Sequence, residues 1–99
     1  MRLSDETLRG RTVISADGLA IGEIAILFID SDAWRVESLQ LKLRKDIADR
    51  LGAGHGMFRA AELEIPIRMV QSVGDAVVLS VAVDELRQVL PTSEPARAH

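Results

Sequence analysis

The chain has 99 residues, a formal net charge of −3 from 12 basic and 15 acidic side chains, and no cysteine. One domain is expected at this length, and the missing cysteines exclude disulfides, thiolate metal centres and cysteine nucleophiles. The acidic balance argues against a nucleic-acid partner, because proteins that bind nucleic acid usually carry a surplus or stripe of basic residues. No apolar run is long enough to cross a bilayer, and the polar N-terminus lacks the apolar segment of a signal peptide, so we expect a cytoplasmic protein without membrane insertion.

The stretch of residues 11–43 determines the expected architecture, because three apolar, β-branched runs alternate there with two turn signals. The polar residues 1–10 lead into this meander as an arm. Asp17-Gly18 predicts a tight hairpin, since Gly readily supplies the positive φ that such turns need. The second turn falls on residues 31–33. The strands are expected at residues 11–15, 19–30 and 34–44.

Two of these strands change phase along their length, which predicts two bulges. In the second strand the change falls at Gly22, and in the third strand it falls at Glu37-Ser38. Bulges of this kind curl a meander towards a barrel instead of leaving it flat.

The second strand is apolar on both faces over its second half. Alternation with a period of two places Ile24, Ile26 and Phe28 together, on the face towards the core. Leu27 and Ile29 then point to the opposite face. Something must cover these two side chains, since a strand that is apolar on both faces is normally buried on both.

The rest of the chain returns to alternation after a long connection at residues 45–61 that contains three closely spaced glycines. Pro66 predicts an edge strand or the end of a strand, because it has no N–H to donate. Asp84 fits the N-cap of a terminal helix that Pro91 ends. The expected elements are a helical turn at residues 46–51, strands at 62–67 and 76–83, a turn-rich link with one helical turn at 68–75, and a helix at 84–90.

Five or six short antiparallel strands, joined by meander turns and curled by bulges, predict a mainly β domain. We expect a small, partly open β-barrel over residues 11–83. The arm at residues 1–10 precedes it, a short C-terminal helix at 84–90 follows it, and a disordered tail occupies 91–99.

Two runs of short motifs along the chain also have a familiar order and spacing. The first run is Leu8-Arg9-Gly10-Arg11-Thr12-Val13, Asp17-Gly18, Ile21-Gly22-Glu23-Ile24, Ile29-Asp30 and Trp34-Arg35-Val36. The second run is Leu63-Glu64-Ile65-Pro66, Val70, Ser72-Val73-Gly74-Asp75 and Val77-Val78-Leu79-Ser80. Together they resemble the PRC-barrel family over about residues 8–83. That family includes the cytoplasmic domain of the photosynthetic reaction-centre H subunit and the C-terminal domain of the ribosome maturation factor.

The resemblance implies a β-barrel adaptor that docks on other macromolecules and has no catalytic function of its own. The reaction-centre subunit carries an N-terminal transmembrane helix, and the maturation factor carries a preceding barrel. This sequence shows neither feature, so we expect neither of those two roles and carry over no functional residue.

Three local patterns suggest chemistry, and each has a simpler interpretation. The glycines at 52–56 lack the spacing of a phosphate-binding loop, and His55 among them has no partner for a triad or a metal site, so a flexible connector is favoured. Residues 30–32 resemble the start of a calcium loop but suit a hairpin turn better. Glu62 and Glu64 share the outer face of a strand, where solvation explains them. We expect no cofactor and no metal.

The best candidates for an interaction surface are apolar. Leu27 and Ile29 are uncovered unless the terminal helix packs on them, so they either complete the core or form an interface. Met57 and Phe58 are a second candidate, since an adaptable Met beside an aromatic ring suits a contact surface. The candidate surface consists of Leu27, Ile29, Met57, Phe58, Leu86, Val89 and Leu90.

These observations favour a non-catalytic adaptor that mediates protein–protein interaction, including self-association, with a dimer as the simplest oligomer. The alternative is an RNA- or ribosome-associated factor, for which Lys42, Arg44 and Lys45 would supply the basic patch. A third possibility is a small-molecule-binding barrel or enzyme, but barrels of this size usually fill their interior with side chains.

Overall fold

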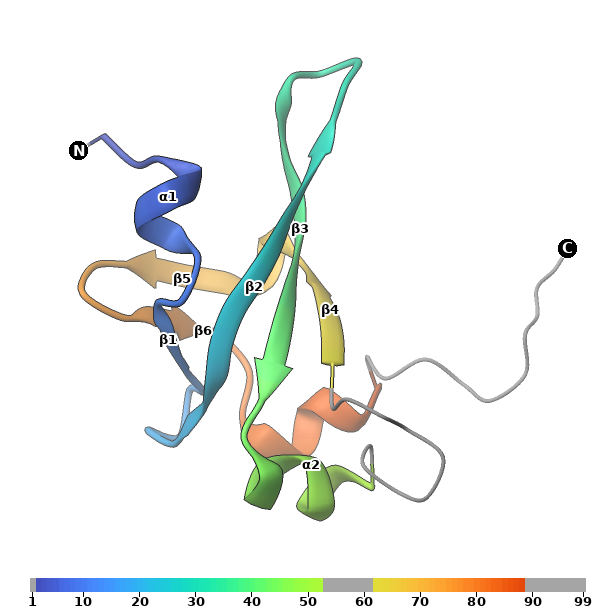
Figure 1. The fold of residues 1–99 in the computed structure, drawn as a ribbon. Helices are drawn as coiled ribbons and strands as arrows, with labels where there is room; N and C mark the ends of the chain where they lie inside the picture. Colours follow the sequence, from blue (N-terminus) through green and yellow to red (C-terminus); the bar gives the residue numbers. More distant parts are fainter. Residues whose placement is uncertain (1, 53–61, 89–99) are drawn as a thin grey trace, which may run out of the picture.

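A single six-stranded sheet forms the body of the protein in the computed structural model, which describes residues 2–52 and 62–88 (Figure 1). The elements are α1 (Asp5–Leu8), β1 (Thr12–Ile14), β2 (Ala20–Asp30), β3 (Arg35–Leu43), α2 (Lys45–Leu51), β4 (Glu62–Pro66), η1 (Ile67–Met69), β5 (Val70–Val73), β6 (Val77–Leu79) and η2 (Val83–Gln88). The strand order is β4-β3-β2-β1-β6-β5. A mainly β domain is thereby confirmed. The expectation of purely antiparallel strands is wrong, because β1 and β6 pair in parallel.

The three-stranded meander expected at residues 11–43 is confirmed, with β1, β2 and β3 paired in chain order. In the first turn Gly18 adopts a φ of +86°, and its N–H donates to the carbonyl oxygen of Ser15 at 2.9 Å. Within the expected arm, Ser4 caps the single turn of α1 by accepting a hydrogen bond from the backbone N–H of Thr7 at 3.1 Å.

Three bulges curl this meander, and two of them lie where the sequence predicts them. Between β1 and β2 the register skips Ile21, which is adjacent to Gly22. Between β2 and β3 it skips Glu37 on β3. The third bulge, which skips Ala25 on β2, is unpredicted. A bulge increases the local twist of a strand pair.

The bulge at Ala25 reverses the faces of β2. The expectation that Ile24, Ile26 and Phe28 share the inner face is wrong, because the extra residue shifts the alternation by one position. Ile24 is buried, whereas Ile26 is 42% exposed. Leu27, expected on the outer face, packs against the core instead.

The two long strands approach each other closely at Gly22. This residue lies opposite Leu43, and a Cβ atom added to it would lie 2.2 Å from the carbonyl oxygen of Lys42. No side chain fits at that distance. Gly22, where the apolar alternation of the sequence changes phase, is therefore also the residue that permits the close approach of β2 and β3.

The core fills the concave side of the sheet and is closed at one end by α2 and η2. Ile47, Ala48 and Leu51 bury one face of α2. In η2, Val83 and Leu86 are buried, and η2 packs against α2. No helix in the described residues is long and apolar enough to cross a membrane.

The C-terminal element differs in type and start from the expected helix at 84–90, since η2 is a 3-10 helix and its first residue is Val83. Asp84 is therefore not its N-cap. Glu85 caps the segment instead, because its side chain accepts the backbone N–H of Ala82 at 2.7 Å. The carboxylate of Asp17 accepts the N–H of Val83 at 3.4 Å and ties η2 to the first turn.

In the second half of the sheet, the structure matches the sequence-based prediction at β4 but differs from it in the elements that follow. β4 ends at Pro66, and Leu63 and Ile65 face the core as expected. The link expected at 68–75 contains a helical turn, η1, but also a strand, β5, which is missed. The last strand, β6, is shorter than the expected 76–83.

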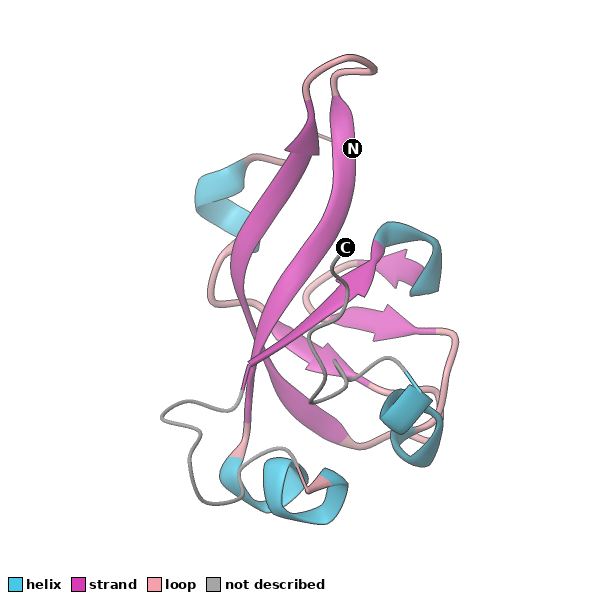
Figure 2. Cartoon of the chain, turned by 90° about the vertical axis from the view of Figure 1, so that its right-hand side faces the viewer, coloured by secondary structure: helices cyan, strands magenta, loops and turns pink. Residues whose placement is uncertain are grey.

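The sheet is strongly curved, and its two edge strands meet at one corner (Figure 2). β4 and β5 are the first and last strands of the sheet order, yet only the three residues of η1 separate them in the chain. η1 also contacts β3. In the part of the chain that the structure describes, no strand ladder joins β4 to β5, so the sheet is not closed.

Candidate interaction surface

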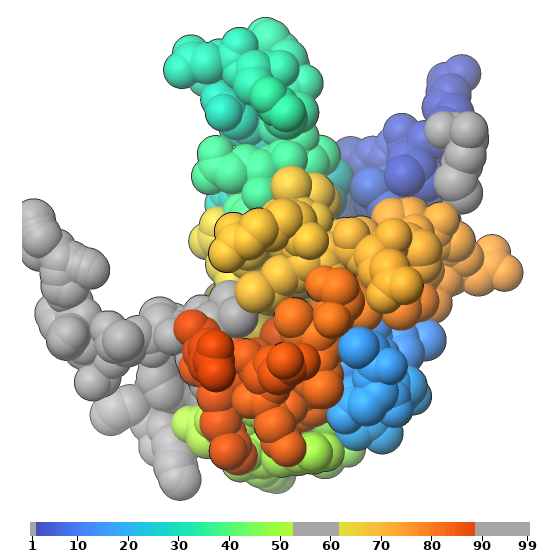
Figure 3. All heavy atoms as spheres, turned by 180° about the vertical axis from the view of Figure 1, so that it is seen from behind, coloured from blue at the N-terminus to red at the C-terminus, as the bar shows by residue number. Residues whose placement is uncertain are grey.

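The outer half of the β2–β3 hairpin stands clear of the rest of the molecule (Figure 3). β1 pairs with β2 only as far as Glu23, and β4 pairs with β3 only from Ser38 onwards. Among the described residues, no further strand pairs with residues 29–37, whereas the β3 partners of residues 26–28 also pair with β4. Residues 26–37 together form the outer part of the hairpin. We call this segment the distal hairpin.

The distal hairpin carries the most exposed large apolar side chains among the described residues. Trp34 is 79% exposed and Ile29 is 54% exposed. Ile26 is on the same ribbon. An isolated exposed apolar residue is ordinary, but several on one projecting element are typical of a contact surface.

The turn of the distal hairpin holds Trp34 in an unusual backbone conformation. Its φ is +54°, and its N–H donates to the carbonyl oxygen of Asp30 at 2.7 Å. The Asp30 carboxylate accepts the N–H groups of Asp32 at 2.9 Å and Ala33 at 3.3 Å. A left-handed conformation costs a bulky residue about 1–2 kcal/mol. Strain of this kind, on an exposed tryptophan, is more common at functional positions than elsewhere.

The same turn settles two predictions made from the sequence. Trp34 was expected at the start of a strand, but it is the last residue of the turn. Residues 30–32 form a hairpin turn as expected, and the Asp30 carboxylate is occupied by backbone donors.

An apolar groove of about 130 Å³ lies beside the base of the distal hairpin. Its lining consists entirely of Leu, Ile and Val side chains. The groove is open at Leu3 and Ile67, which are 41% and 39% exposed. We call it the apolar groove, and its principal lining residues are Leu3, Leu8, Leu27, Val36, Ile67 and Val73.

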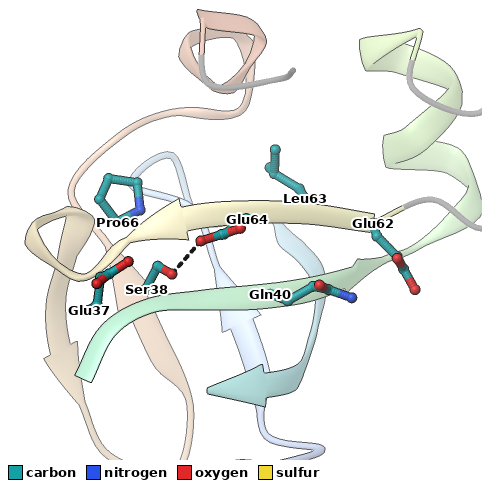
Figure 4. A pocket seen from close by; sticks show the side chains of 7 residues that line it. All are labelled: Glu37, Ser38, Gln40, Glu62, Leu63, Glu64 and Pro66. Carbon is teal, nitrogen blue, oxygen red and sulfur yellow. Dashed lines mark hydrogen bonds between the residues drawn. The ribbon is translucent and has the colours of Figure 1, made fainter. Parts of the chain in front are cut away.

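A larger, shallow depression of about 550 Å³ lies on the outer face of β3 and β4 (Figure 4). Glu37, Glu62 and Glu64 contribute carboxylates to it, and the Ser38 hydroxyl donates to Glu64 at 2.5 Å. Glu62 and Glu64 are exposed, as expected for a solvated outer face. A carboxylate that accepts one hydroxyl donor keeps further lone pairs to accept hydrogen bonds from polar or cationic groups.

The candidate residues named from the sequence are not brought together. Leu27 lines the apolar groove, Ile29 is exposed on the distal hairpin, and Leu86 is fully buried beside α2. The structure therefore divides the predicted surface into core and exposed parts. Four predicted residues lie outside the described residues: Met57, Phe58, Val89 and Leu90.

The remaining sequence candidates have ordinary structural settings. Lys42, Arg44 and Lys45 are exposed, and Arg44 forms an ion pair with Asp46 at 3.3 Å, which neutralises part of the basic patch. Gly52 ends α2 with a φ of +78°. His55 and the other glycines of that connection lie outside the described residues. No cluster of three His, Cys, Asp or Glu side chains suited to a metal ion occurs in residues 2–52 and 62–88.

Sequence reasoning missed Trp34 and the apolar groove. The alternation of Trp34 with Val36 predicts a strand residue. In the structure the turn is one residue longer than the expected 31–33 and includes Trp34. Leu3 and Ile67 are 64 residues apart in the chain, so no local pattern connects them.

The chain matches no family model, and no curated protein sequence matches it significantly.

Proposed function

We propose that this protein is a non-catalytic adaptor of PRC-barrel type, acting in the cytoplasm, that binds other proteins through its distal hairpin and also associates with itself. The observation that carries the proposal is the exposure of Trp34 and Ile29 on a two-stranded projection. Burying a large apolar side chain releases about 1.5–3 kcal/mol, so these two residues alone would provide a substantial part of a binding energy. Tryptophan is also among the residues most enriched at the energetic centre of interfaces.

The barrel character of the proposal has its own support. The edge strands β4 and β5 converge at η1, and bulges at Ile21, Ala25 and Glu37 bend the long strands. A sheet bent in this way needs little further curvature for its edges to meet. The motif order along residues 8–83 resembles the PRC-barrel family in the same region.

The adaptor proposal is tested by comparing two variants with the unmodified chain as bait in a nuclease-treated lysate. The double variant Ile29→Ser, Trp34→Ser removes the exposed apolar surface of the distal hairpin. The control Leu19→Ser removes an apolar residue that is 39% exposed at the opposite end of β2. We expect the hairpin variant to lose the bound proteins and the control to keep them.

Two results contradict the adaptor proposal. Proteins that remain bound to the hairpin variant would show that the distal hairpin is not the binding surface. Binding that disappears with nuclease and with added salt would favour the RNA-associated alternative and the patch at Lys42, Arg44 and Lys45.

A further inference from the structure

We propose that the apolar groove receives the distal hairpin of a second copy of this chain, with Trp34 as the inserted residue, in a reciprocal dimer. The inference rests on the proposed function and identifies both surfaces of the self-association. It follows from the size, the charge and the placement of the two features.

The apolar lining and the open side of the groove suit the edge of an aromatic ring. An apolar cavity of about 150 Å³ holds a benzene-sized ligand. This groove, at about 130 Å³, is slightly smaller, so it receives one edge of the indole ring while the rest of the ring stays in the opening. Its lining offers no polar group that an inserted ring would leave unpaired. The opening at Leu3 and Ile67 leaves the indole N–H of Trp34 a path to water.

The charges beside the two features are complementary. Asp30 and Asp32 precede Trp34 in the turn. Arg2 and Arg68 are exposed and adjoin Leu3 and Ile67, the two residues at the opening of the groove. Within the described residues none of these four charged side chains forms an ion pair. Arg35 follows Trp34 and offsets one of the two acidic side chains, so insertion of Trp34 brings a turn with a net charge of −1 to a basic rim. This difference in charge favours the correct orientation of encounter.

The placement of the two features explains why the occupant is a second copy. The groove includes Leu27 and Val36, so it borders the base of the hairpin whose turn carries Trp34. Trp34 is exposed in the chain itself and does not line the groove. Two chains placed side by side in opposite directions bring each turn to the other chain's groove. A dimer of this kind has a two-fold symmetry axis, and its formation buries Trp34 of both chains.

The test uses the complete chain and measures the dissociation constant of the dimer by light scattering over a dilution series. Trp34→Ala removes the inserted ring, and Leu3→Glu places a charge at the opening of the groove. We expect each variant to weaken the dimer at least about 30-fold, the effect of losing an interface hot spot. The control Leu19→Glu changes an equally exposed apolar residue away from both features and should leave the dimer unchanged.

Mixing the two variants provides the decisive comparison. In the mixed dimer, Trp34 of the Leu3→Glu chain meets the intact groove of the Trp34→Ala chain, so one of the two insertions is restored. We expect the mixture to form dimers more tightly than either variant alone. A second groove variant, Ile67→Glu, gives the same comparison if Leu3→Glu alters folding, which circular dichroism reports.

Three results overturn the reciprocal dimer. They are an unmodified chain that stays monomeric, a dimer that Leu3→Glu and Ile67→Glu leave intact, and a mixture that is no tighter than its components. If the Ile29→Ser, Trp34→Ser variant loses its lysate partners while any of these results is found, the binding of other proteins through the distal hairpin still stands, so the two failures are distinguishable.

Discussion

Replacement of Gly22 by Ala is expected to destabilise the fold strongly. The new Cβ atom would lie 2.2 Å from the carbonyl oxygen of Lys42 and 3.0 Å from the Cα atom of Leu43. Both neighbours are backbone atoms of β3, so no side-chain rotation relieves the overlap. β2 and β3 must separate where Gly22 and Leu43 are paired and where the N–H of Arg44 donates to the carbonyl oxygen of Ile21 at 2.8 Å.

The magnitude follows from overpacking and from a disturbed ladder. Overpacking a buried site costs typically 1–3 kcal/mol, and a weakened backbone hydrogen bond adds about 1 kcal/mol. We therefore expect a loss of about 2–4 kcal/mol in the free energy of unfolding. For a domain of this size that corresponds to a fall in Tm of roughly 10–25 °C.

The measurement is urea unfolding followed by circular dichroism, with Gly74→Ala as the matched control. A Cβ atom at Gly74 meets nothing within 4 Å, and its φ is not in the positive region. The control should change stability by less than about 1 kcal/mol, with a small gain from the stiffer unfolded chain. If Gly22→Ala is as stable as Gly74→Ala, β2 and β3 do not approach each other at Gly22 as closely as described.

Three further changes test other parts of the structure. Trp34→Gly should raise the free energy of unfolding by up to about 1 kcal/mol in thermal unfolding, because Gly adopts a positive φ without strain; a loss of stability would show that the Trp34 backbone is not strained. The Ser15 hydroxyl that donates to Asp17 lowers the pKa of this carboxyl, so its contribution is complete above about pH 4 and is lost as the pH falls through the lower folded pKa. Asp17→Asn should therefore be less stable than the unmodified chain at pH 7, with the difference shrinking below about pH 4; a constant difference would contradict this. Leu86→Ala should lose about 2–5 kcal/mol in urea unfolding, because Leu86 is fully buried; a loss below about 1 kcal/mol would contradict the packing of η2.

The meander was predictable because its signals are local. Asp17-Gly18 indicates a tight turn in any context, and the phase changes at Gly22 and Glu37 are visible in the alternation of apolar residues. The bulge at Ala25 is invisible in the sequence, because both Ile24 and Ile26 are apolar and either phase fits the pattern. One silent bulge was enough to reverse the assignment of Ile26 and Leu27 to the two faces.

Elements that depend on distant partners were less predictable. β5 has two exposed polar residues, Gln71 and Ser72, between its apolar ends, and it is a strand because it pairs with β6. The parallel pairing of β1 with β6 joins Val13 to Val77, which no local pattern reveals. Ile29 was nameable from the sequence as a candidate for an interaction surface. The groove proposed to receive its neighbour Trp34 was not, because the residues that line it lie far apart in the chain.

The fluorescence of Trp34 tests the proposed role of the distal hairpin most directly. It is the only tryptophan in the sequence and is 79% exposed in the single chain, so its emission reports on this position alone. We predict that its emission shifts to shorter wavelength, and that acrylamide quenches it less, in step with the rise in mass measured by light scattering as the protein is concentrated. A rise in mass while Trp34 keeps the emission and quenching of a solvated indole would show that association uses another surface.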